Sequence, residues 1–290
     1  MNRNLKVLNF NVINYLILSL ISLLTVYPFI YVLAASFSSG YAVTHGEVTL
    51  FPVGFNLEAY SQVFKENGLW TAYGNTIYYT VVGTAVSILL TLFGAYPLSK
   101  KRLVGRKWIG FFIVFTMLFN AGIIPFYINL KDLDLLNTRM GVIIPFAIST
   151  FNVIILRTFF QAVPDELEEA ATVDGATDWQ VLWKIYLPLA MPALATIALF
   201  YAVSRWNGYF WSMIILRDQE LIPLQVLLTK LIVSLRPSDN AVAAAGDIVS
   251  YTQETVIYAT IIISIIPIIA VYPFIQRFFV KGVMVGSVKG

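Results

Sequence analysis

Six long apolar stretches run along the chain, separated by segments that are richer in polar residues. They cover residues 13–37, 75–98, 108–127, 141–160, 189–215 and 256–279. Each is about twenty residues long or more, and at about 1.5 Å per residue a helix of that length crosses a hydrocarbon core of about 30 Å. The pattern therefore predicts an all-α, polytopic membrane protein with six transmembrane helices.

The first apolar stretch also has features of a secretory signal peptide. Arg3 and Lys6 precede it, and Ala34-Ala35-Ser36 offers a small-residue cleavage site. The apolar run is longer than the core of a typical signal peptide, so we interpret it as an uncleaved membrane helix.

Composition supports a membrane protein and excludes several kinds of chemistry. The 290 residues are 58% hydrophobic and 12% charged, whereas roughly a quarter of the residues in a soluble domain are charged. The absence of cysteine excludes disulfides and thiolate chemistry, and the single histidine, His45, has no clustered partner for a metal site. Nothing suggests a nucleic-acid partner.

The apolar stretches carry no Asp, Glu or His in their interiors. Proton-coupled carriers and intramembrane hydrolases usually need such groups within the membrane, so both classes are disfavoured. The chain also has no Gly-x4-Gly-Lys-Ser/Thr phosphate loop. We therefore expect a protein that is not an enzyme and that holds no cofactor of its own.

The distribution of Lys and Arg predicts the orientation. A basic cluster follows the second stretch, formed by Lys100, Lys101, Arg102, Arg106 and Lys107. With six spans, the side that holds this cluster carries twelve Lys and Arg residues and the opposite side carries six. Because positive charge stays in the cytoplasm, both termini and the segment 162–188 are expected there.

The segment that begins at Pro164 is polar yet strongly helical. Pro164 and the acidic residues after it favour a helix start, and Gly175 favours its end. Thr177 and Gln180 form a capping-box pattern that predicts a second helix. Periodicity alone is compatible with an ordinary helix-turn-helix connection on the membrane surface.

The order of residues in this segment resembles the EAA loop of the membrane subunits of bacterial ATP-binding-cassette importers. The resemblance is carried by Glu169-Ala170-Ala171, then three residues and Gly175, and finally Ile185-Tyr186-Leu187-Pro188. The C-terminal residues 283–290, VMVGSVKG, are similar to the ending of the smaller maltose-permease subunit and its relatives in the carbohydrate-uptake group, which include complex-polysaccharide permeases.

This resemblance implies a type I importer permease fold, with residues 1–290 as one transmembrane domain in the bacterial cytoplasmic (inner) membrane. Segment 162–188 would be the cytoplasmic coupling loop, 217–254 an extracytoplasmic loop that contacts a solute-binding protein, and 280–290 a cytoplasmic tail. The implied partners are a second, related permease subunit and two ATPase subunits that bind ATP and Mg. The implied ATPase-coupling residues are Glu168, Glu169, Ala170, Ala171, Asp174 and Gly175.

One charge lies within an apolar stretch. Burying Arg205 costs roughly 2.5–3.5 kcal/mol, so we expect it to face a partner or a wet cavity. The aromatic residues beside it have two interpretations, an interfacial belt or the wall of a path for a ring-shaped polar solute. The candidate path residues are Asn120, Asn152, Arg205, Trp206, Asn207, Tyr209 and Trp211.

These observations favour a permease subunit that forms half of the path for an oligosaccharide or polysaccharide. Two alternatives to this interpretation remain. One is a permease for another polar solute, such as a peptide, with the same loop and a different path lining. The other is a membrane scaffold that transports nothing.

Overall fold

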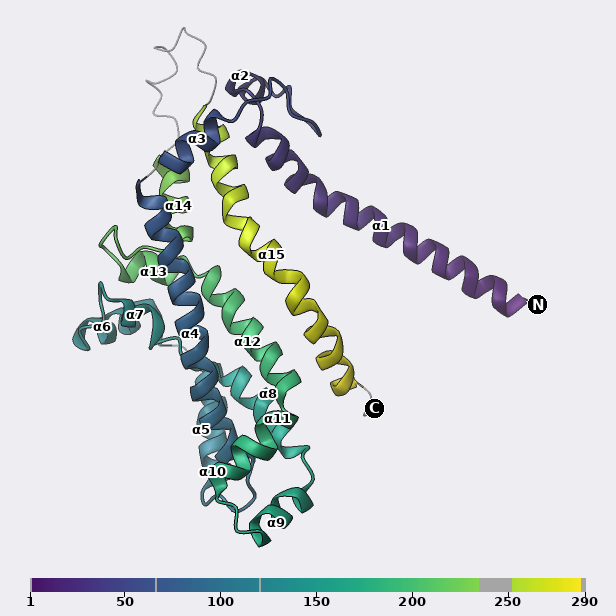
Figure 1. The fold of residues 1–290 in the computed structure, drawn as a ribbon, viewed down its shortest axis with the longest axis vertical. Coiled ribbons are helices and arrows are strands. Elements are labelled where there is room, and N and C mark those ends of the chain that lie inside the picture. Colours follow the sequence, from purple (N-terminus) through teal and green to yellow (C-terminus); the bar gives the residue numbers. More distant parts are fainter. Residues whose placement is uncertain (1, 66, 120, 235–251, 288–290) are drawn as a thin grey trace. The chain divides into compact units, whose positions relative to one another are not determined.

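The computed structural model describes residues 2–65, 67–119, 121–234 and 252–287 (Figure 1). All regular elements among these residues are helical, as the apolar pattern predicts. The chain divides into two compact units. One consists of Met1–Leu69 with Leu228–Ile268, and the other of Trp70–Leu227 with Ile269–Gly290.

The first unit is built around the end of α1 (Asn2–Ser36). Its small core consists of Ala34, Ala35, Ala42, Val43 and Val48. These residues come from α1, from α2 (Gly40–Thr44) and from the chain after α2. None of the apolar window of α1 is buried, as expected for a helix whose neighbours are lipid or another chain. The polar segment between the first two apolar stretches therefore contains regular structure, since α2 and α3 (Glu58–Lys65) both lie in it.

Three helices among the described residues are long and apolar enough to cross a membrane. They are Phe10–Ser36 in α1, Gly68–Ser99 in α4 (Asn67–Ser99), and Gln253–Pro273 in α15 (Gln253–Ser287). Two further pairs of helices pass the same test together but are bent, by 115° between Arg106–Leu118 and Ile123–Asp132 and by 81° between Asp178–Leu189 and Met191–Trp206. The first, second and sixth predicted spans are thus single helices, and the count of six is not confirmed.

The third and fourth predicted spans are each broken into two helices. In the third, α5 (Arg106–Leu118) gives way to α6 (Ile123–Asp132) at Gly122, whose φ of +88° suits glycine better than any residue with a side chain. In the fourth, α7 (Arg139–Ile143) is followed by an irregular stretch and then by α8 (Thr150–Gln161). The hydroxyl of Ser149 accepts a hydrogen bond from the backbone of α8 and caps it.

The fifth predicted span is also divided, into α12 (Met191–Trp206) and α13 (Phe210–Ile215). The N–H groups of Asn207 and Gly208 donate to the carbonyls of Val203 and Arg205, which closes the last turn of α12. These breaks fall inside apolar sequence, where hydropathy gives no sign of them.

The segment 217–254, expected to be a polar loop, contains an apolar helix, α14 (Leu224–Ser234). Its first residue is fully buried, and the Leu224 N–H donates to Thr76 Oγ1 of α4 over 2.8 Å. Asn75 of α4 donates to the carbonyl of Ile222 over 3.1 Å. Buried side chains of α4 therefore fix the start of α14. The segment is polar when averaged over its length, so its average composition does not indicate this short apolar helix.

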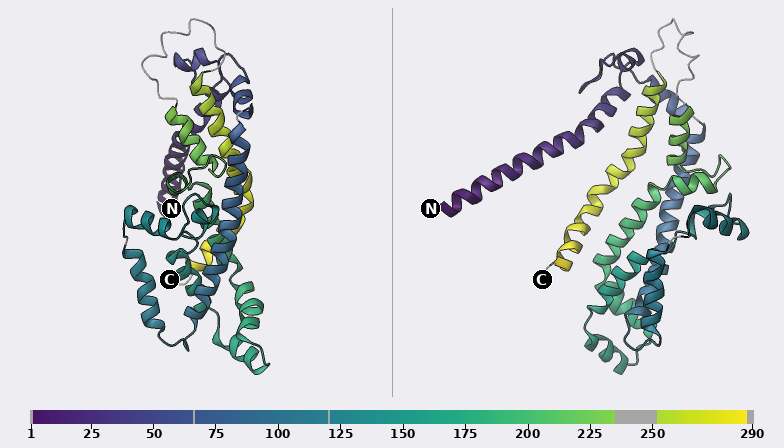
Figure 2. Two further views of the ribbon diagram at one scale, coloured as in Figure 1. Left: turned by 90° about the vertical axis from the view of Figure 1, so that its left-hand side faces the viewer. Right: turned by 180° about the vertical axis from the view of Figure 1, so that it is seen from behind.

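The main core of the second unit lies where α4, α8 and α12 run side by side (Figures 1 and 2). It also includes residues that follow Gly175, from α10 (Asp178–Val181), the π-helical turn η1 (Leu182–Tyr186) and α11 (Leu187–Leu189). The largest fully buried side chains of this core are Leu92, Leu156, Phe160, Leu182 and Ile197. The segment after Gly175 is thus part of the packed core.

A substitution at Gly141 would test how tightly the broken fourth span is packed. An added Cβ would overlap the carbonyl oxygen of Leu135 and lie 3.1 Å from Cγ2 of Ile215. We expect Gly141→Ala to destabilise the fold by about 1–3 kcal/mol, measured as a lower melting temperature of the protein in detergent. Gly74→Ala is the matched control, because nothing lies within 4 Å of an added Cβ there. Equal melting temperatures for the two variants would contradict this packing.

Candidate functional site

The first helix of the segment 162–188 is α9 (Asp165–Val173). It begins directly after Pro164, and Asp165, Glu166 and Glu168 place negative charge in its first turn, where the helix dipole favours it. It is closed by Gly175, whose φ is +80° and whose N–H donates to the Thr172 carbonyl over 3.0 Å. Both predicted ends of this helix are confirmed.

The predicted capping box starts the next helix. The N–H of Gln180 donates to Thr177 Oγ1 over 3.3 Å, and the N–H of Thr177 donates to Gln180 Oε1 over 2.9 Å. The helix then passes through the π-helical turn η1, which turns Tyr186 into the protein. Such π-turns are uncommon and often lie at functional sites.

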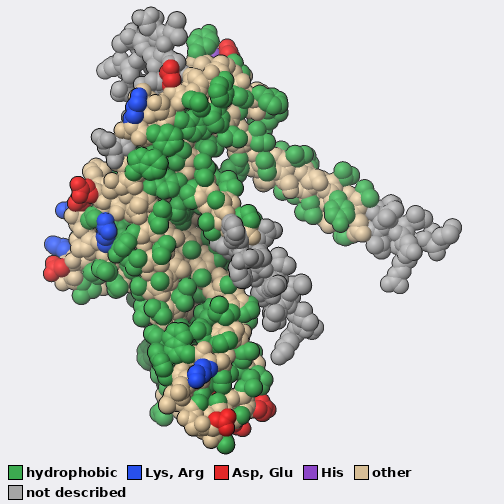
Figure 3. Space-filling model, viewed as in Figure 1, with side chains coloured by type: hydrophobic (Ala, Val, Ile, Leu, Met, Phe, Trp, Pro, Cys, Tyr) green, Lys and Arg blue, Asp and Glu red, His purple; other side chains and the backbone are tan. Residues whose placement is uncertain are grey.

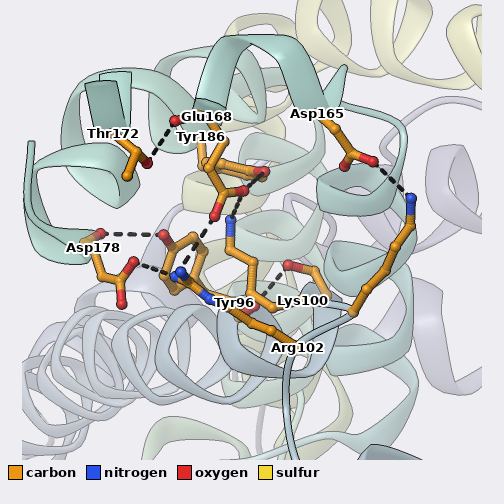
Figure 4. Close-up of polar contacts among 10 residues, drawn as sticks. Tyr96, Lys100, Arg102, Asp165, Glu168, Thr172, Asp178 and Tyr186 are labelled. Carbon is orange, nitrogen blue, oxygen red and sulfur yellow. Dashed lines mark hydrogen bonds and ion pairs between the residues drawn. The ribbon is translucent and has the colours of Figure 1, made fainter. Parts of the chain in front are cut away.

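Lys100, at the end of α4, holds α9 through Glu168 (Figure 4). Its Nζ lies 2.6 Å from Glu168 Oε2, and the hydroxyl of Tyr186 donates to the same oxygen over 2.7 Å. The ammonium also lies over two aromatic rings, 3.7 Å from the centroid of Tyr186 and 4.3 Å from that of Tyr96. The side chains of Lys100 and Glu168 are only 9% and 18% exposed, so this is a largely buried ion pair.

The charges of this pair depend on each other. Burial raises the pKa of the Glu168 carboxyl, but hydrogen bonds from Lys100 and Tyr186 and the nearby positive charges outweigh burial, so the pKa lies below its usual value. Burial also lowers the pKa of Lys100, and Glu168 opposes that effect. The Glu168 carboxylate, with Oε2 2.6 Å from Lys100 Nζ, is the partner that favours the charged ammonium.

Three further ion pairs contribute to this joint between the end of α4 and the segment 162–188. Lys101 Nζ lies 2.6 Å from Asp165 Oδ2, and Arg102 donates to Asp178 and lies 3.6 Å from Glu168 Oε1. The Lys101–Asp165 and Arg102–Asp178 pairs are solvent-exposed and therefore add little to stability. Three consecutive basic residues thus each contact an acidic side chain of the segment 162–188.

Sequence reasoning used this basic cluster only to predict orientation and missed its contacts with the loop. The available signal was the predicted topology, which placed the cluster and the acidic residues of α9 on the same side of the membrane. Opposite charges on one side of a membrane favour contact, although the pairing of Lys100 with Glu168 spans 68 residues.

The six residues implied to couple to an ATPase divide into two groups. Glu168 points inward to Lys100, and Ala171 is half-buried against the main core. The other four are exposed, together with Val173, which is 88% exposed. The exposed members are Glu169, Ala170, Asp174 and Gly175. Figure 3 shows acidic side chains gathered at this end of the molecule.

The candidate path residues are also divided. Asn152, Arg205 and Trp211 line one cavity of about 450 Å³, between α8, α12 and α13. The candidates that do not line it are Trp206, Asn207 and Tyr209. The remaining candidate, Asn120, lies outside the described residues.

Arg205 is held by backbone groups of the broken fourth span. Its guanidinium donates to the carbonyls of Val142 over 2.7 Å, Ile143 over 3.0 Å and Phe146 over 2.8 Å. These carbonyls are available because the helix is interrupted between α7 and α8. The polar partner expected for this charge is therefore supplied within the chain itself, and the same side chain forms part of the cavity wall.

Comparison with known proteins gives one family model that covers most of the chain. It is described as "Binding-protein-dependent transport system inner membrane component" and matches residues 68–285. The match includes α9, the Lys100–Glu168 pair and the cavity lined by Arg205.

Individual relatives match over almost their full length. The chain is 41% identical over 281 residues to the polygalacturonan/rhamnogalacturonan transport system permease protein YtcP of Bacillus subtilis (strain 168), which covers 97% of this chain and 98% of that protein. It is 28% identical over 275 residues to the arabinooligosaccharides transport system permease protein AraQ of Halalkalibacterium halodurans, with 93% of each chain covered.

A crystal structure is similar in both sequence and fold. It is that of a bacterial ABC transporter involved in the import of the acidic polysaccharide alginate. A chain of this transporter is 50% identical, with a TM-score of 0.87, over 93% of this chain and 96% of that chain.

The Lys100–Glu168 pair makes a direct prediction about stability. Glu168→Ala leaves the largely buried ammonium of Lys100 without its partner. We therefore expect the free energy of unfolding to fall by an amount at the lower end of about 3–5 kcal/mol, and the melting temperature in detergent to fall with it. Glu169→Ala, at the exposed neighbouring position, should melt like the wild type. Adding Lys100→Met to Glu168→Ala should recover part of the loss. A Glu168→Ala variant as stable as Glu169→Ala would refute the anchoring role.

Proposed function

This chain belongs to the family of inner-membrane components of binding-protein-dependent transport systems, and from that membership we propose that it is the permease subunit of an ATP-driven importer of oligosaccharides or polysaccharides. The observation that carries the proposal is the nearly full-length match to saccharide permeases, at 41% identity to a polygalacturonan/rhamnogalacturonan system and 50% to an alginate importer. The chain would form half of the path and pair with a second, related permease subunit.

Six spans with both termini in the cytoplasm remain the proposed topology. The three long helices would give three crossings, and each of the two bent pairs is proposed to give one more. The sixth crossing would be formed by α8 together with the irregular stretch before it. The twelve residues of α8 rise only about 18 Å, which is too short to cross the hydrocarbon core alone. Support for the orientation comes from the Lys and Arg asymmetry and from the contacts of Lys100, Lys101 and Arg102 with the cytoplasmic segment.

The exposed face of α9 is the proposed docking surface for an ATPase subunit. ATP and Mg would be bound by two partner ATPase subunits, and this chain would convert their movement into movement of its spans. The Lys100–Glu168 pair and Tyr186 fasten α9 to α4 and η1, so a displacement of α9 would pull on the end of α4. The tail 280–290 is proposed to lie on the same side, and segment 217–254 to meet the solute-binding protein outside.

The cavity lined by Arg205 favours an acidic saccharide as solute. Its aromatic wall includes Trp211, whose ring centroid lies 4.7 Å from that of Phe126 and 5.8 Å from that of Phe146. Flat aromatic faces accept the C–H face of a sugar ring. Among the described residues no carboxylate pairs with Arg205, so its positive charge favours an anion nearby even though backbone carbonyls occupy much of its hydrogen bonding.

The solute class is tested with the whole importer in liposomes, this chain together with its second permease, ATPase and binding protein. We expect acidic oligosaccharides such as oligouronates to stimulate ATP hydrolysis, and neutral oligosaccharides of equal length to do so much less. Trp211→Ala should weaken stimulation by up to about tenfold, since an aromatic contact contributes about 0.5–1.5 kcal/mol. Trp206→Phe is the control, because Trp206 lies outside the cavity lining. Stimulation by peptides and by no saccharide would overturn the proposal.

The docking surface is tested at Val173. Val173→Asp places a charge on the apolar, 88% exposed position of α9, and we expect copurification of the ATPase subunit to fall by about tenfold or more. Val104→Asp is a matched control, because Val104 is 90% exposed and lies in the turn between α4 and α5. Membrane insertion of both variants should equal that of the wild type. Undiminished copurification with Val173→Asp would place the ATPase elsewhere.

A further inference from the structure

Two arginines come together between α5 and α8, away from the joint at α9. Arg106 is the first residue of α5, and Arg157 lies about one turn before the end of α8. The two helices pack against each other, and the guanidinium of Arg157 lies against Gly110 of α5, where its Nη1 would be 3.7 Å from an added Cβ. The two positive charges are close enough to act on each other.

No acidic side chain among the described residues forms an ion pair with either arginine. The Nε atoms of Arg106 and Arg157 are both buried without a hydrogen-bond partner. Asp165 is the acidic side chain paired with neighbouring Lys101. Both side chains are half-buried, and a buried N–H without a partner costs free energy, while two nearby positive charges also repel each other. An anion from outside the chain would satisfy both.

The arginines form one wall of a cavity of about 880 Å³ that is polar at one end and apolar along α5. Its cationic residues are Lys101, Arg106, Lys107 and Arg157, and its apolar residues include Leu103, Trp108, Phe111 and Val114. A small inorganic anion would use only the cationic end. The remainder suits a ligand that has an anionic head and an apolar tail.

The position of this cavity agrees with such a ligand. It lies at the start of α5, next to the basic turn that the Lys and Arg asymmetry assigns to the cytoplasmic side. Trp108 is 72% exposed and Phe111 is 58% exposed, so α5 offers an aromatic surface to lipid just beyond the charged end. Basic pockets between helices at the cytoplasmic face are suited to acidic lipid headgroups.

We propose that this cavity is a binding site for an anionic phospholipid of the inner leaflet, with Arg106 and Arg157 holding the phosphate. Each guanidinium can donate two parallel hydrogen bonds to phosphate oxygens. Lys107 adds positive charge that selects an anionic headgroup over a zwitterionic one. Phe111 and Val114 lie along the first part of an acyl chain. The bound lipid ties α5 to α8.

The test is native mass spectrometry of the delipidated, fully assembled importer, titrated with phosphatidylglycerol or with phosphatidylcholine. We expect one tightly retained phosphatidylglycerol and weaker binding of phosphatidylcholine. The double variant Arg106→Gln with Arg157→Gln should weaken phosphatidylglycerol binding by about tenfold or more. Lys184→Gln is the matched control, because Lys184 is exposed on the same side and does not line the cavity.

Several outcomes would overturn the proposal. One is equal binding of the two lipids by the unmodified protein, a comparison that needs no variant and holds even if the double variant fails to fold. Another is full competition by millimolar inorganic phosphate, which would assign the site to a soluble anion. A third is loss of a partner subunit from the double variant without any change in lipid retention, which would make an acidic side chain of that subunit the natural occupant.

Discussion

A charge inside an apolar protein is stable only where an opposite charge or several hydrogen bonds meet it, and the position of α9 depends on one such contact. Lys100 directly follows α4, Glu168 lies on α9, and Tyr186 lies on η1. The Lys100 ammonium and the Tyr186 hydroxyl both lie within 2.7 Å of one carboxylate oxygen of Glu168. None of the three elements can move away alone without leaving a buried polar group unpaired. The exposed face of α9 is therefore presented on a helix that is fixed from behind.

The same need to pair a charge applies within the apolar helices. Arg205 lies in sequence that reads as a continuous span, yet three backbone carbonyls of the neighbouring, interrupted span accept its hydrogen bonds. The interruption and the arginine account for each other, because a complete helix would have used those carbonyls itself. Between α5 and α8 lie two arginines with which no acidic side chain of the described residues forms an ion pair. There the proposed lipid phosphate takes the role that Glu168 has beside Lys100.

Local signals in the sequence predicted local structure well. Pro164, Gly175 and the Thr177–Gln180 capping box gave the ends of α9 and the start of α10, because each acts on the backbone within a few residues. Hydropathy predicted the long helices but neither the breaks within apolar stretches nor the short helix α14.

Contacts between distant residues were predictable only in part. The candidates around Arg205 were all chosen for their aromatic or polar chemistry. Arg205 and Trp211 line one cavity with Asn152, whereas Trp206, Asn207 and Tyr209 do not. Adjacent residues point in different directions around a helix end, so closeness in sequence was a poor guide there. The pairing of Lys100 with Glu168 depends on how α4 meets α9, which no periodicity encodes.

We infer that the Lys100–Glu168 pair holds the candidate coupling helix in place. Hydrogen–deuterium exchange of the α9 amides, residues 165–173, can be compared between the wild type and Lys100→Met. We expect faster exchange across α9 in the variant, with unchanged exchange in α12, because α9 then opens without its main tether. Identical α9 exchange in the two proteins would contradict it.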